Sequence, residues 1–233
     1  MPERPSVVLI PSQLQNAQTW GPQIAALGGD YDFHVADNTR DDTIAGIASR
    51  LLAVSAPTFD LVAHGMGGFV ALEVLRQASE RVRSLVLMST LAPNDGPAQT
   101  ERRQGYIKLV EDGNFAGVIE ERIPILVHAA RREDEPLLAV LRRMAEDTGP
   151  DIFLRQQRAI MARIDSRPSL AAITCPLLLV RGAECGITTQ AHQDEILAAV
   201  PQVRLETVEN SGHMVTLEMP WTINRLLADW LAR

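Results

Sequence analysis

The chain has 233 residues, 46% of them hydrophobic, which suits one α/β domain with an insertion and a well-filled core. Its formal net charge of −7 and the lack of a long basic run exclude nucleic acid as an expected partner. The start of the chain has no apolar region typical of a signal peptide, and no apolar run could cross a bilayer, so we expect no membrane contact and a cytoplasmic location. Two cysteines, Cys175 and Cys185, do not make a disulfide framework.

The first part of the chain alternates short apolar runs with amphipathic segments. Strands are expected at residues 6–10, 32–36, 58–63 and 82–88. Helices are expected at residues 21–27, at 41–52 with its cap at 41–43, and at 69–77. This order predicts an α/β fold with a mostly parallel sheet and helices on both faces.

The alternation stops between residues 97 and 166. This part contains helical stretches at 99–111, 115–130, 136–146 and 152–164, whose arginine and glutamate runs we interpret as solvated helix faces. Strands then return at 176–181 and 203–208, with helices at 190–200 and 216–231. The sequence therefore predicts a core domain of residues 1–96 and 167–233 and a helical cap insertion of residues 97–166.

A strand, a turn of small residues and a helix follow one another between residues 60 and 72. This order is typical of a nucleophile elbow, in which a sharp turn presents a serine above a parallel sheet. Residue 65, where that serine belongs, is Gly65, so the nucleophile position is vacant. The backbone N–H groups of Met66 and of the loop at Ser12-Gln13 still predict an oxyanion hole, because they do not depend on the side chain at position 65.

A second motif follows the strand at 203–208. It reads Gly212-His213, followed by a leucine, a glutamate and a proline at positions 217, 218 and 220, and it predicts His213 as a general base. The acid that orients such a histidine should lie in the loop after the strand at 176–181. The aligned position in that loop holds Cys185, and Glu184 lies one residue too early.

Together these features resemble the α/β-hydrolase superfamily, in particular small capped esterases, over nearly the whole chain from Val7 to Trp230. The resemblance implies hydrolysis of carboxylic esters or related acyl compounds through an acyl-enzyme, without a cofactor. Gly65 and Cys185 stand where the family has serine and aspartate. Two changed triad positions predict an impaired or rebuilt site, either in a natural member or in an engineered or inactivated variant.

Three functional hypotheses remain open at this point. In the first, a relocated nucleophile, Cys185 or Ser12, uses His213 as its base and hydrolyses activated carboxylic esters weakly. In the second, the protein is inactive and binds a small ligand between sheet and cap. In the third, His213 performs acid–base chemistry in a non-hydrolytic, lyase-like enzyme.

The expected ligand under all three hypotheses is a small apolar ester or acyl compound. The sequence gives no basis for predicting the oligomeric state. A metal site is not expected, because the histidines lack ligand spacing. Apart from His213 they are interpreted as structural or surface residues: His34, His64, His128 and His192.

Overall fold

A computed structural model describes residues 4–233 of the chain. Within that range, six parallel strands form a single sheet in the order β2-β1-β3-β4-β5-β6. The strands are β1 (Ser6–Ile10), β2 (Asp32–Val35), β3 (Phe59–His64), β4 (Val82–Met88), β5 (Leu177–Gly182) and β6 (Arg204–Val208). The predicted α/β fold with a mostly parallel sheet is confirmed.

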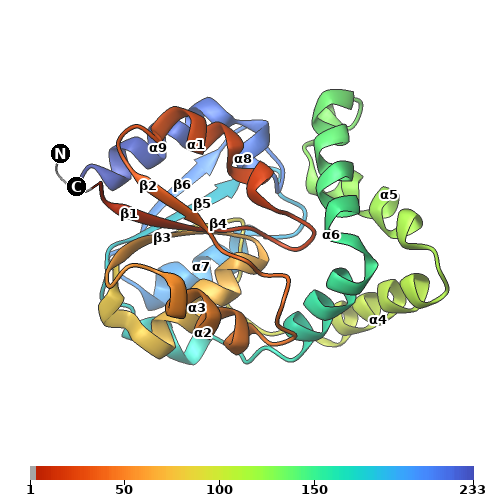
Figure 1. The fold of residues 1–233 in the computed structure, drawn as a ribbon, viewed down its shortest axis with the longest axis horizontal. Helices are drawn as coiled ribbons and strands as arrows, with labels where there is room; N and C mark the ends of the chain where they lie inside the picture. The colour runs from red at the N-terminus through yellow and green to blue at the C-terminus, as the bar shows by residue number, and fades with distance from the viewer. Residues whose placement is uncertain (1–3) are drawn as a thin grey trace.

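Helices cover both faces of the sheet (Figure 1). On one face lie α1 (Gly21–Leu27), α8 (Val215–Glu218) and α9 (Pro220–Leu231). On the other face lie α2 (Ile44–Val54), α3 (Met66–Ala78) and α7 (Gln190–Ala199). Every residue of β3 is buried, because a parallel strand in the middle of the sheet has helices on both sides. The described residues also contain short 3₁₀ helices at Ala17–Trp20, Ser79–Arg81, Ala129–Arg131 and Arg167–Ala172.

Alternate residues of each strand fill two separate apolar layers. Val7 and Leu9 of β1 pack with the α1 and α9 side, in a cluster that includes Trp20 and Trp230. Val8 and Ile10 pack on the opposite side with α2 and α3. The side-chain period of two therefore assigns neighbouring residues of one strand to different cores.

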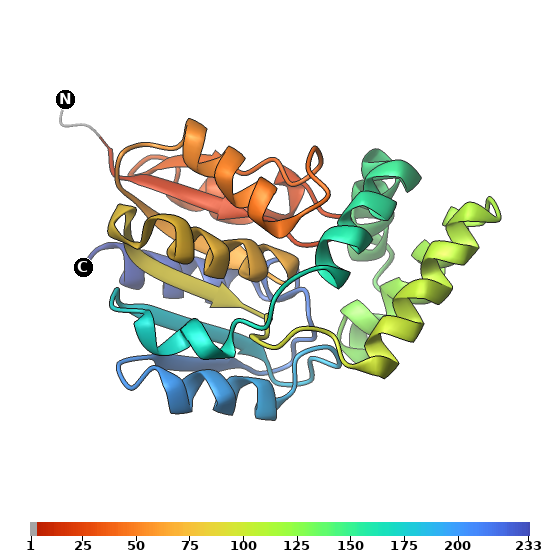
Figure 2. The same cartoon turned by 90° about the horizontal axis from the view of Figure 1, so that it is seen from below.

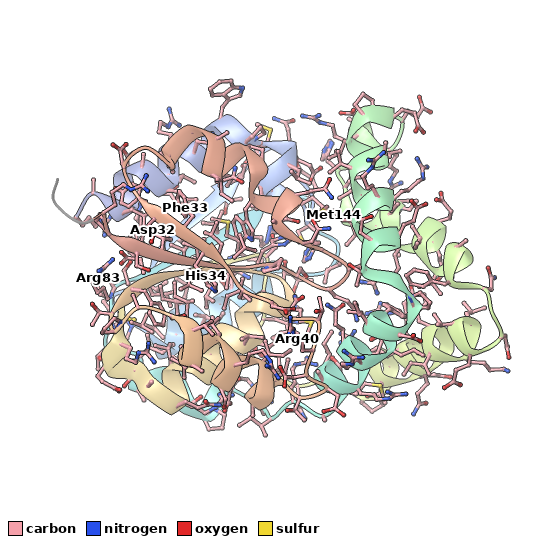
Figure 3. All side chains as sticks on the ribbon, in the orientation of Figure 1. Asp32, Phe33, His34, Arg40, Arg83 and Met144 are labelled. Carbon is pink, nitrogen blue, oxygen red and sulfur yellow. The ribbon has the colours of Figure 1, made fainter. Side chains whose placement is uncertain are left out.

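The helices α4 (Pro97–Glu111), α5 (Phe115–Leu126) and α6 (Glu135–Met161) form a separate group beyond the carboxyl ends of the strands (Figures 1 and 2). They share a third apolar cluster that also includes Leu14 and Met214 from loops of the sheet domain. Met144 of α6 projects toward that domain (Figure 3), and its sulfur accepts a hydrogen bond of 3.3 Å from the Thr19 hydroxyl. The division of the chain at residues 97 and 166 stays a prediction, although these helices occupy most of that interval.

Two predicted helices end differently from expectation. The closing helix, expected to run unbroken over residues 216–231, is divided into α8 and α9 at Met219, because Pro220 starts a new helix at its first position. The helix expected at 115–130 ends at Leu126, and the chain then turns through a short 3₁₀ helix. Both errors lie at helix ends, where local propensity is a weak guide.

The expected break at Gly149-Pro150 takes a particular form. Helical structure runs from Glu135 to Met161, but Gly149 has φ 76° and ψ 169°, so the axis changes direction there. A residue other than glycine would be strained in this conformation. The kink lets the two halves of α6 contact different loops of the sheet domain.

No helix within residues 4–233 is long and apolar enough to span a membrane.

The strand order places the loops that carry the motifs next to one another. The order reverses between β1 and β3, which lie side by side although β2 separates them in sequence. Such a switch point opens a crevice at the carboxyl ends of the strands, where α/β proteins bind ligands. The loop after β1 and the turn after β3 both begin there.

Candidate active site

The turn between β3 and α3 has the strained backbone of a nucleophile elbow. Gly65 has φ 52° and ψ −115°, a region that glycine adopts at little cost. Its N–H donates to the Met88 carbonyl oxygen at 2.9 Å, and its own carbonyl accepts from the Thr90 hydroxyl at 2.8 Å. A Cβ at Gly67 would overlap the backbone of Ile10, so the helix approaches β1 as closely as only glycine permits. The small residues thus fix the turn in place even though no serine occupies it.

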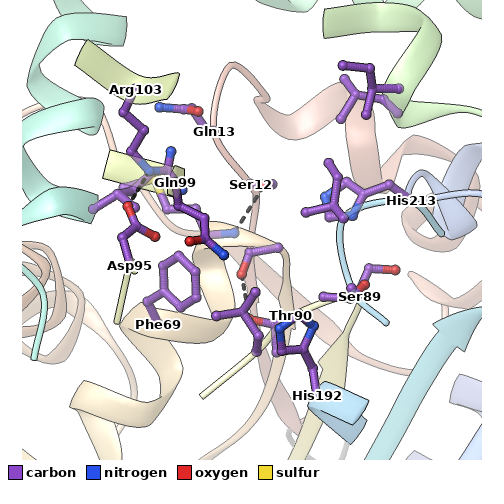
Figure 4. Close-up of a pocket in the computed structure, with 18 of the residues that line it drawn as sticks. Ser12, Gln13, Phe69, Ser89, Thr90, Asp95, Gln99, Arg103, His192 and His213 are labelled. Carbon is purple, nitrogen blue, oxygen red and sulfur yellow. Dashed lines mark hydrogen bonds and ion pairs between the residues drawn. The ribbon is translucent and has the colours of Figure 1, made fainter. Parts of the chain in front are cut away.

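The Ser12 side chain fills the space that a residue at position 65 would use. A Cβ built on Gly65 would overlap Ser12 Oγ, and the same point lies 3.1 Å from His213 Nε2. Ser12 Oγ accepts a hydrogen bond of 3.0 Å from the Met66 N–H. Ser12 and His213 therefore lie on either side of one point in the pocket. Figure 4 shows both residues in the pocket lining.

Two buried amides hold the loop that carries Ser12. Asn38 Nδ2 donates to the carbonyl oxygens of Pro11 and Ser12 at 3.0 and 3.3 Å. Gln156 of α6 accepts from the Leu14 N–H at 3.1 Å, and its own amide donates to Asn38 Oδ1 at 3.2 Å. The loop is consequently fixed from the sheet side and from α6 at once.

The His213 loop rests on a buried carboxylate. Glu218, 1% exposed, accepts from the N–H groups of His128, Gly212 and Met214 at 2.6, 2.9 and 3.1 Å. Burial raises the pKa of Glu218, while these three donors act in the opposite direction. The glutamate of the Gly-His motif therefore anchors the loop and does not reach the imidazole ring.

His64, the last residue of β3, also holds the loop that carries His213. Its ring is fully buried, and Nε2 donates to the His213 carbonyl oxygen at 2.8 Å. Burial, followed by the neighbouring His213 ring, lowers the pKa of His64 to about 3. A neutral, structural His64 agrees with its interpretation from sequence.

The two ring nitrogens of His213 face different surroundings. Nδ1 lies 3.5 Å from Cys185 Sγ, which also accepts from the Thr188 N–H at 3.3 Å and lies 2.9 Å from the Thr188 hydroxyl. With Sγ accepting from the Nδ1–H, Nε2 carries the free lone pair and faces the Gly65 side. Cys185 thus takes the orienting position of the family's acid, as the alignment predicted.

Among residues 4–233, no carboxylate charge reaches the His213 ring. Burial, and then the positive charge of Arg122, lower the pKa of His213 from 6.5 to about 3. The Glu184 carboxylate accepts instead from the Ser211 N–H at 3.2 Å and lies 4.0 Å from His128. The imidazole is therefore neutral at physiological pH, and no anionic partner in the described part of the chain stabilises its protonated form.

A cavity of about 350 Å³ connects these groups with α4, α5 and α6. The expected site residues that line it are Ser12, Gln13, Gly65, Met66 and His213. Cys185 is not among the described residues that line the cavity, because its thiol lies behind the ring. The structure thus brings five of the six predicted site residues to one cavity and places the sixth, Cys185, behind the His213 ring.

The "Alpha/beta hydrolase family" profile matches residues 8–222, most of the chain. The chain belongs to this family. Two similar proteins, from Pseudomonas savastanoi pv. phaseolicola and Enterobacter cloacae, are each named "Putative carbamate hydrolase RutD". Both are 26% identical to the chain, covering 98% of it and 94% and 91% of their own lengths.

Solved structures of the hydrolase fold superpose closely. A thermophilic esterase from Thermogutta terrifontis, described as malate bound, has a TM-score of 0.88 at 22% identity over 98% of this chain and 89% of its own. The enol-lactonase from Burkholderia xenovorans has a TM-score of 0.89 at 20% identity over 99% of this chain and 92% of its own. At these identities the likeness concerns the fold.

Sequence reasoning missed most of the charged residues of this hydrolase's cavity. The runs on the helices of residues 97–166 were interpreted as solvated faces, and that is wrong for Arg103, Arg122 and Arg163, which line the cavity. His192, interpreted as structural or surface, lines it as well and also caps α7 through Thr189. The only available signal was their occurrence in the predicted cap, since which helix face turns inward depends on packing.

The histidines and acidic residues do not gather into a metal centre in the part of the chain that the structure describes. Residues 4–233 contain no cluster of three or more histidine, cysteine, aspartate or glutamate side chains with the arrangement of metal ligands.

Proposed function

We propose that this hydrolase-family protein slowly hydrolyses small carboxylic esters or related acyl compounds, with Ser12 as nucleophile and His213 as base. One observation carries the proposal: the Ser12 hydroxyl fills the space vacated at Gly65, accepts from the Met66 N–H and shares that space with His213 Nε2. A hydroxyl from the loop after β1 thus lies where the nucleophile of the family is expected.

The reaction follows the acyl-enzyme route of the family. Ser12 Oγ attacks the carbonyl carbon while its proton moves to His213 Nε2, which forms a tetrahedral oxyanion. The bond to the leaving oxygen then breaks, and Nε2 returns the proton to it. Water attacks the acyl-serine, loses a proton to Nε2, and Ser12 Oγ leaves with that proton, so ester and water become acid and alcohol.

One hydrogen-bond donor for the oxyanion comes from the loop after β1, whereas the Met66 N–H already donates to Ser12 Oγ. The Gln13 amide Nε2 is buried and has no partner among residues 4–233, so it is free to donate to a ligand oxygen. The Met66 N–H, which donates to Ser12 Oγ, favours negative charge on that oxygen. These donors are set in place before a ligand arrives.

The rate should be low because His213 lacks an acid. Replacing the orienting carboxylate of a serine hydrolase triad by a neutral group costs about 10⁴-fold in kcat. A histidine whose pKa lies near 3 is also a weak base at neutral pH. Slow turnover, detectable with activated esters, is the expected level.

The cysteine version of this hypothesis is less well supported. Cys185 Sγ faces Nδ1 of His213, on the side of the ring away from the cavity. An acyl group on that sulfur would have to fit where Thr188 packs against it at 2.9 Å. The thiol is better suited to orienting the ring.

The relatives extend the substrate panel to carbamates. Both relatives are named for carbamate hydrolysis, and the carbonyl carbon of a carbamate can be attacked by the same hydroxyl. We therefore include an activated carbamate with the esters to be tested.

A second candidate function is ligand binding without turnover. It is favoured by buried donors in the cavity, among them Gln13 Nε2 and the Ser89 hydroxyl, that have no partner within the described residues 4–233. A lyase-like reaction, the remaining alternative, would use the exposed lone pair of His213 Nε2 alone. It would survive loss of the Ser12 hydroxyl and fail with loss of His213.

The experiment combines turnover with adduct mapping. The protein is incubated with p-nitrophenyl acetate and with p-nitrophenyl N-methylcarbamate, and intact mass and peptide mapping follow release of p-nitrophenol. We expect an acyl or carbamoyl adduct on Ser12 that is lost in Ser12→Ala and His213→Ala, and retained in Ser49→Ala, a surface control on α2. An adduct on Cys185 would transfer the nucleophile to the thiol, for which Cys175→Ala is the control. Release at the buffer rate with no adduct would reject hydrolysis in favour of binding.

A further inference from the structure

The cavity is cationic although the protein as a whole is acidic. Its charged lining consists of four arginines and one aspartate: Arg102, Arg103, Arg122, Arg163 and Asp95. The chain's formal net charge is −7. A cavity with charge opposite to that of the whole protein concentrates ligands of the other sign.

Two of these arginines share one carboxylate, that of Asp95, which offsets one of their two positive charges. Its carboxylate accepts from Arg103 Nε at 2.5 Å and from Arg163 Nη2 at 2.8 Å. The two guanidinium groups hold the pKa of Asp95 below its usual range against the effect of burial. Figure 4 shows Arg103 and Asp95 joined on one wall, so this pair leaves little attraction for a ligand.

Arg122 of α5 has no such partner among residues 4–233. Its guanidinium lies over the rings of Tyr106 and Phe153, 5.5 and 5.8 Å from their centroids. None of the ion pairs in the described part of the chain includes Arg122, and its Nε is buried without a hydrogen bond there. Burial, and then the charge of Arg103, lower the pKa of Arg122 to about 10, which leaves it protonated at neutral pH.

A partly buried guanidinium whose Nε is buried without a hydrogen bond is destabilising unless an anion binds to it. Leaving such a donor without a partner costs more than an ordinary hydrogen bond contributes. Arg122 and His213 line the same cavity, and the positive charge of Arg122 helps to lower the pKa of the His213 ring. The Gln13 amide, also unpartnered within the described residues, lies at the same cavity.

We propose that the cavity binds a small organic carboxylate, with the carboxylate group held by Arg122. A guanidinium offers two parallel N–H groups that match the oxygens of a carboxylate. The cavity volume of about 350 Å³ fits a ligand of a few carbon atoms.

The corresponding substrate class is the monoester of a small dicarboxylic acid. This assignment rests on the hydrolysis proposed above. The free carboxylate would occupy Arg122, and the ester would reach Ser12. This proposal differs from the expectation of an apolar ligand, because it places a charge at one end of the ligand. Binding of the carboxylate itself does not depend on turnover.

The test uses two inert ligands of the same shape. Isothermal titration calorimetry compares the monoamide of glutaric acid, which has one carboxylate, with the neutral diamide. We expect the monoamide to bind about tenfold to a hundredfold more tightly, since each charge-assisted contact contributes on that scale. Raising the salt concentration from about 50 mM to about 500 mM should narrow this gap without weakening the diamide.

Matched variants assign the effect to one side chain. Arg122→Gln should abolish the preference, and Arg122→Lys should retain part of it because the charge stays while the planar fork is lost. Arg143→Gln removes the same charge from α6 outside the cavity and should keep the preference. Equal binding of the two ligands by the native protein, or an unchanged preference in a folded Arg122→Gln variant, overturns the proposal. Because amides are used, failure here is distinct from failure to hydrolyse esters.

Discussion

The two sides of the His213 ring differ in how they meet the loss of a family residue. On the Nε2 side, the side chain missing at Gly65 is replaced in space by the Ser12 hydroxyl. On the Nδ1 side, the thiol of Cys185 lies 3.5 Å from the ring, where the resemblance to the family predicts a carboxylate. The first change retains shape and a hydroxyl, whereas the second retains shape and loses charge.

Under the proposed function, this difference predicts a site that positions its groups for catalysis but reacts slowly. The contact with Cys185 Sγ orients the His213 ring, and hydrogen bonds hold the backbone of His213 and the Ser12 loop in position. Only charge could offset the burial that lowers the pKa of His213 to about 3, and no carboxylate within residues 4–233 supplies it. Variants that change one side of the ring and leave the other intact, or that restore both, separate positioning from charge.

The largest effect is expected from restoring both sides in one protein. The triple variant Ser12→Gly, Gly65→Ser and Cys185→Asp regains a hydroxyl on the elbow and a carboxylate beside Nδ1. We expect kcat/KM for an activated ester to rise by about 10³- to 10⁴-fold over the native chain, the scale of the orienting acid. The pH profile should also gain an inflection as the carboxylate raises the pKa of His213.

The matched control for that variant carries Ser12→Gly and Gly65→Ser without Cys185→Asp. It repairs the Nε2 side alone and should show little of the increase. If the control gains as much as the triple variant, the missing charge does not limit the rate and the comparison of the two sides fails.

The next effect concerns stability in acid. His64 and His213 have folded-state pKa values of about 3, below the value near 6.5 of an unfolded chain. Between these values the unfolded chain binds more protons, so stability is complete above pH 6.5 and falls as pH decreases toward 3. Well below pH 6.5, each ring contributes a slope of about 1.4 kcal/mol per pH unit.

Urea unfolding at several pH values measures this slope. His64→Gln removes one of the two rings and should lower the slope between pH 6 and 4 by about that amount. His34→Gln, at an exposed position on β2, controls for the loss of an imidazole. An unchanged slope in His64→Gln would mean that the buried ring is not kept neutral by the fold.

A smaller effect tests whether Ser12 really fills the position of the elbow side chain. Gly65→Ser alone should destabilise the protein by about 1–3 kcal/mol, because its Cβ would overlap Ser12 Oγ. Adding Ser12→Gly should relieve most of this cost, which a double-mutant cycle measures as a coupling energy.

The matched control for the overlap is Gly113→Ser. Gly113 also has a positive φ, 84°, but a Cβ there would meet nothing within 4 Å, so this variant reports the backbone strain alone. Additive effects of Gly65→Ser and Ser12→Gly would show that the two side chains do not compete for space.

The fold and the histidine loop could be predicted because both depend on local patterns. The sequence shows apolar runs of strand length, the small-residue turn at 65–68 and the Gly212-His213 pair. The turn and the pair both lie beyond the carboxyl ends of strands, as predicted. Ser12 was expected on the adjacent loop, but its entry into the space at Gly65 depends on how closely β1 and β3 pack. The local pattern cannot supply that distance.

The cavity's charges could not be predicted for a different reason. Arg122 occurs among glutamates on an amphipathic helix, a composition that commonly faces water. Its inward orientation depends on Tyr106 and Phe153, which come from α4 and α6 and stack with it in three dimensions. Long-range packing, rather than helix propensity, decides which side chain becomes available to a ligand.

The smallest expected effect concerns Glu184, the only carboxylate adjacent in sequence to the thiol. If it acted on His213 from a displaced position, the Nδ1 side would have recovered its charge and the asymmetry of the ring would disappear. Its carboxylate is instead occupied by the Ser211 N–H at 3.2 Å. Glu184→Gln, which keeps an oxygen for that bond, should therefore change kcat/KM by less than about twofold and stability by less than about 0.5 kcal/mol. A larger fall in kcat/KM at unchanged stability would identify Glu184 as the missing acid, since loss of a charge felt by the ring slows proton transfer without unfolding the loop.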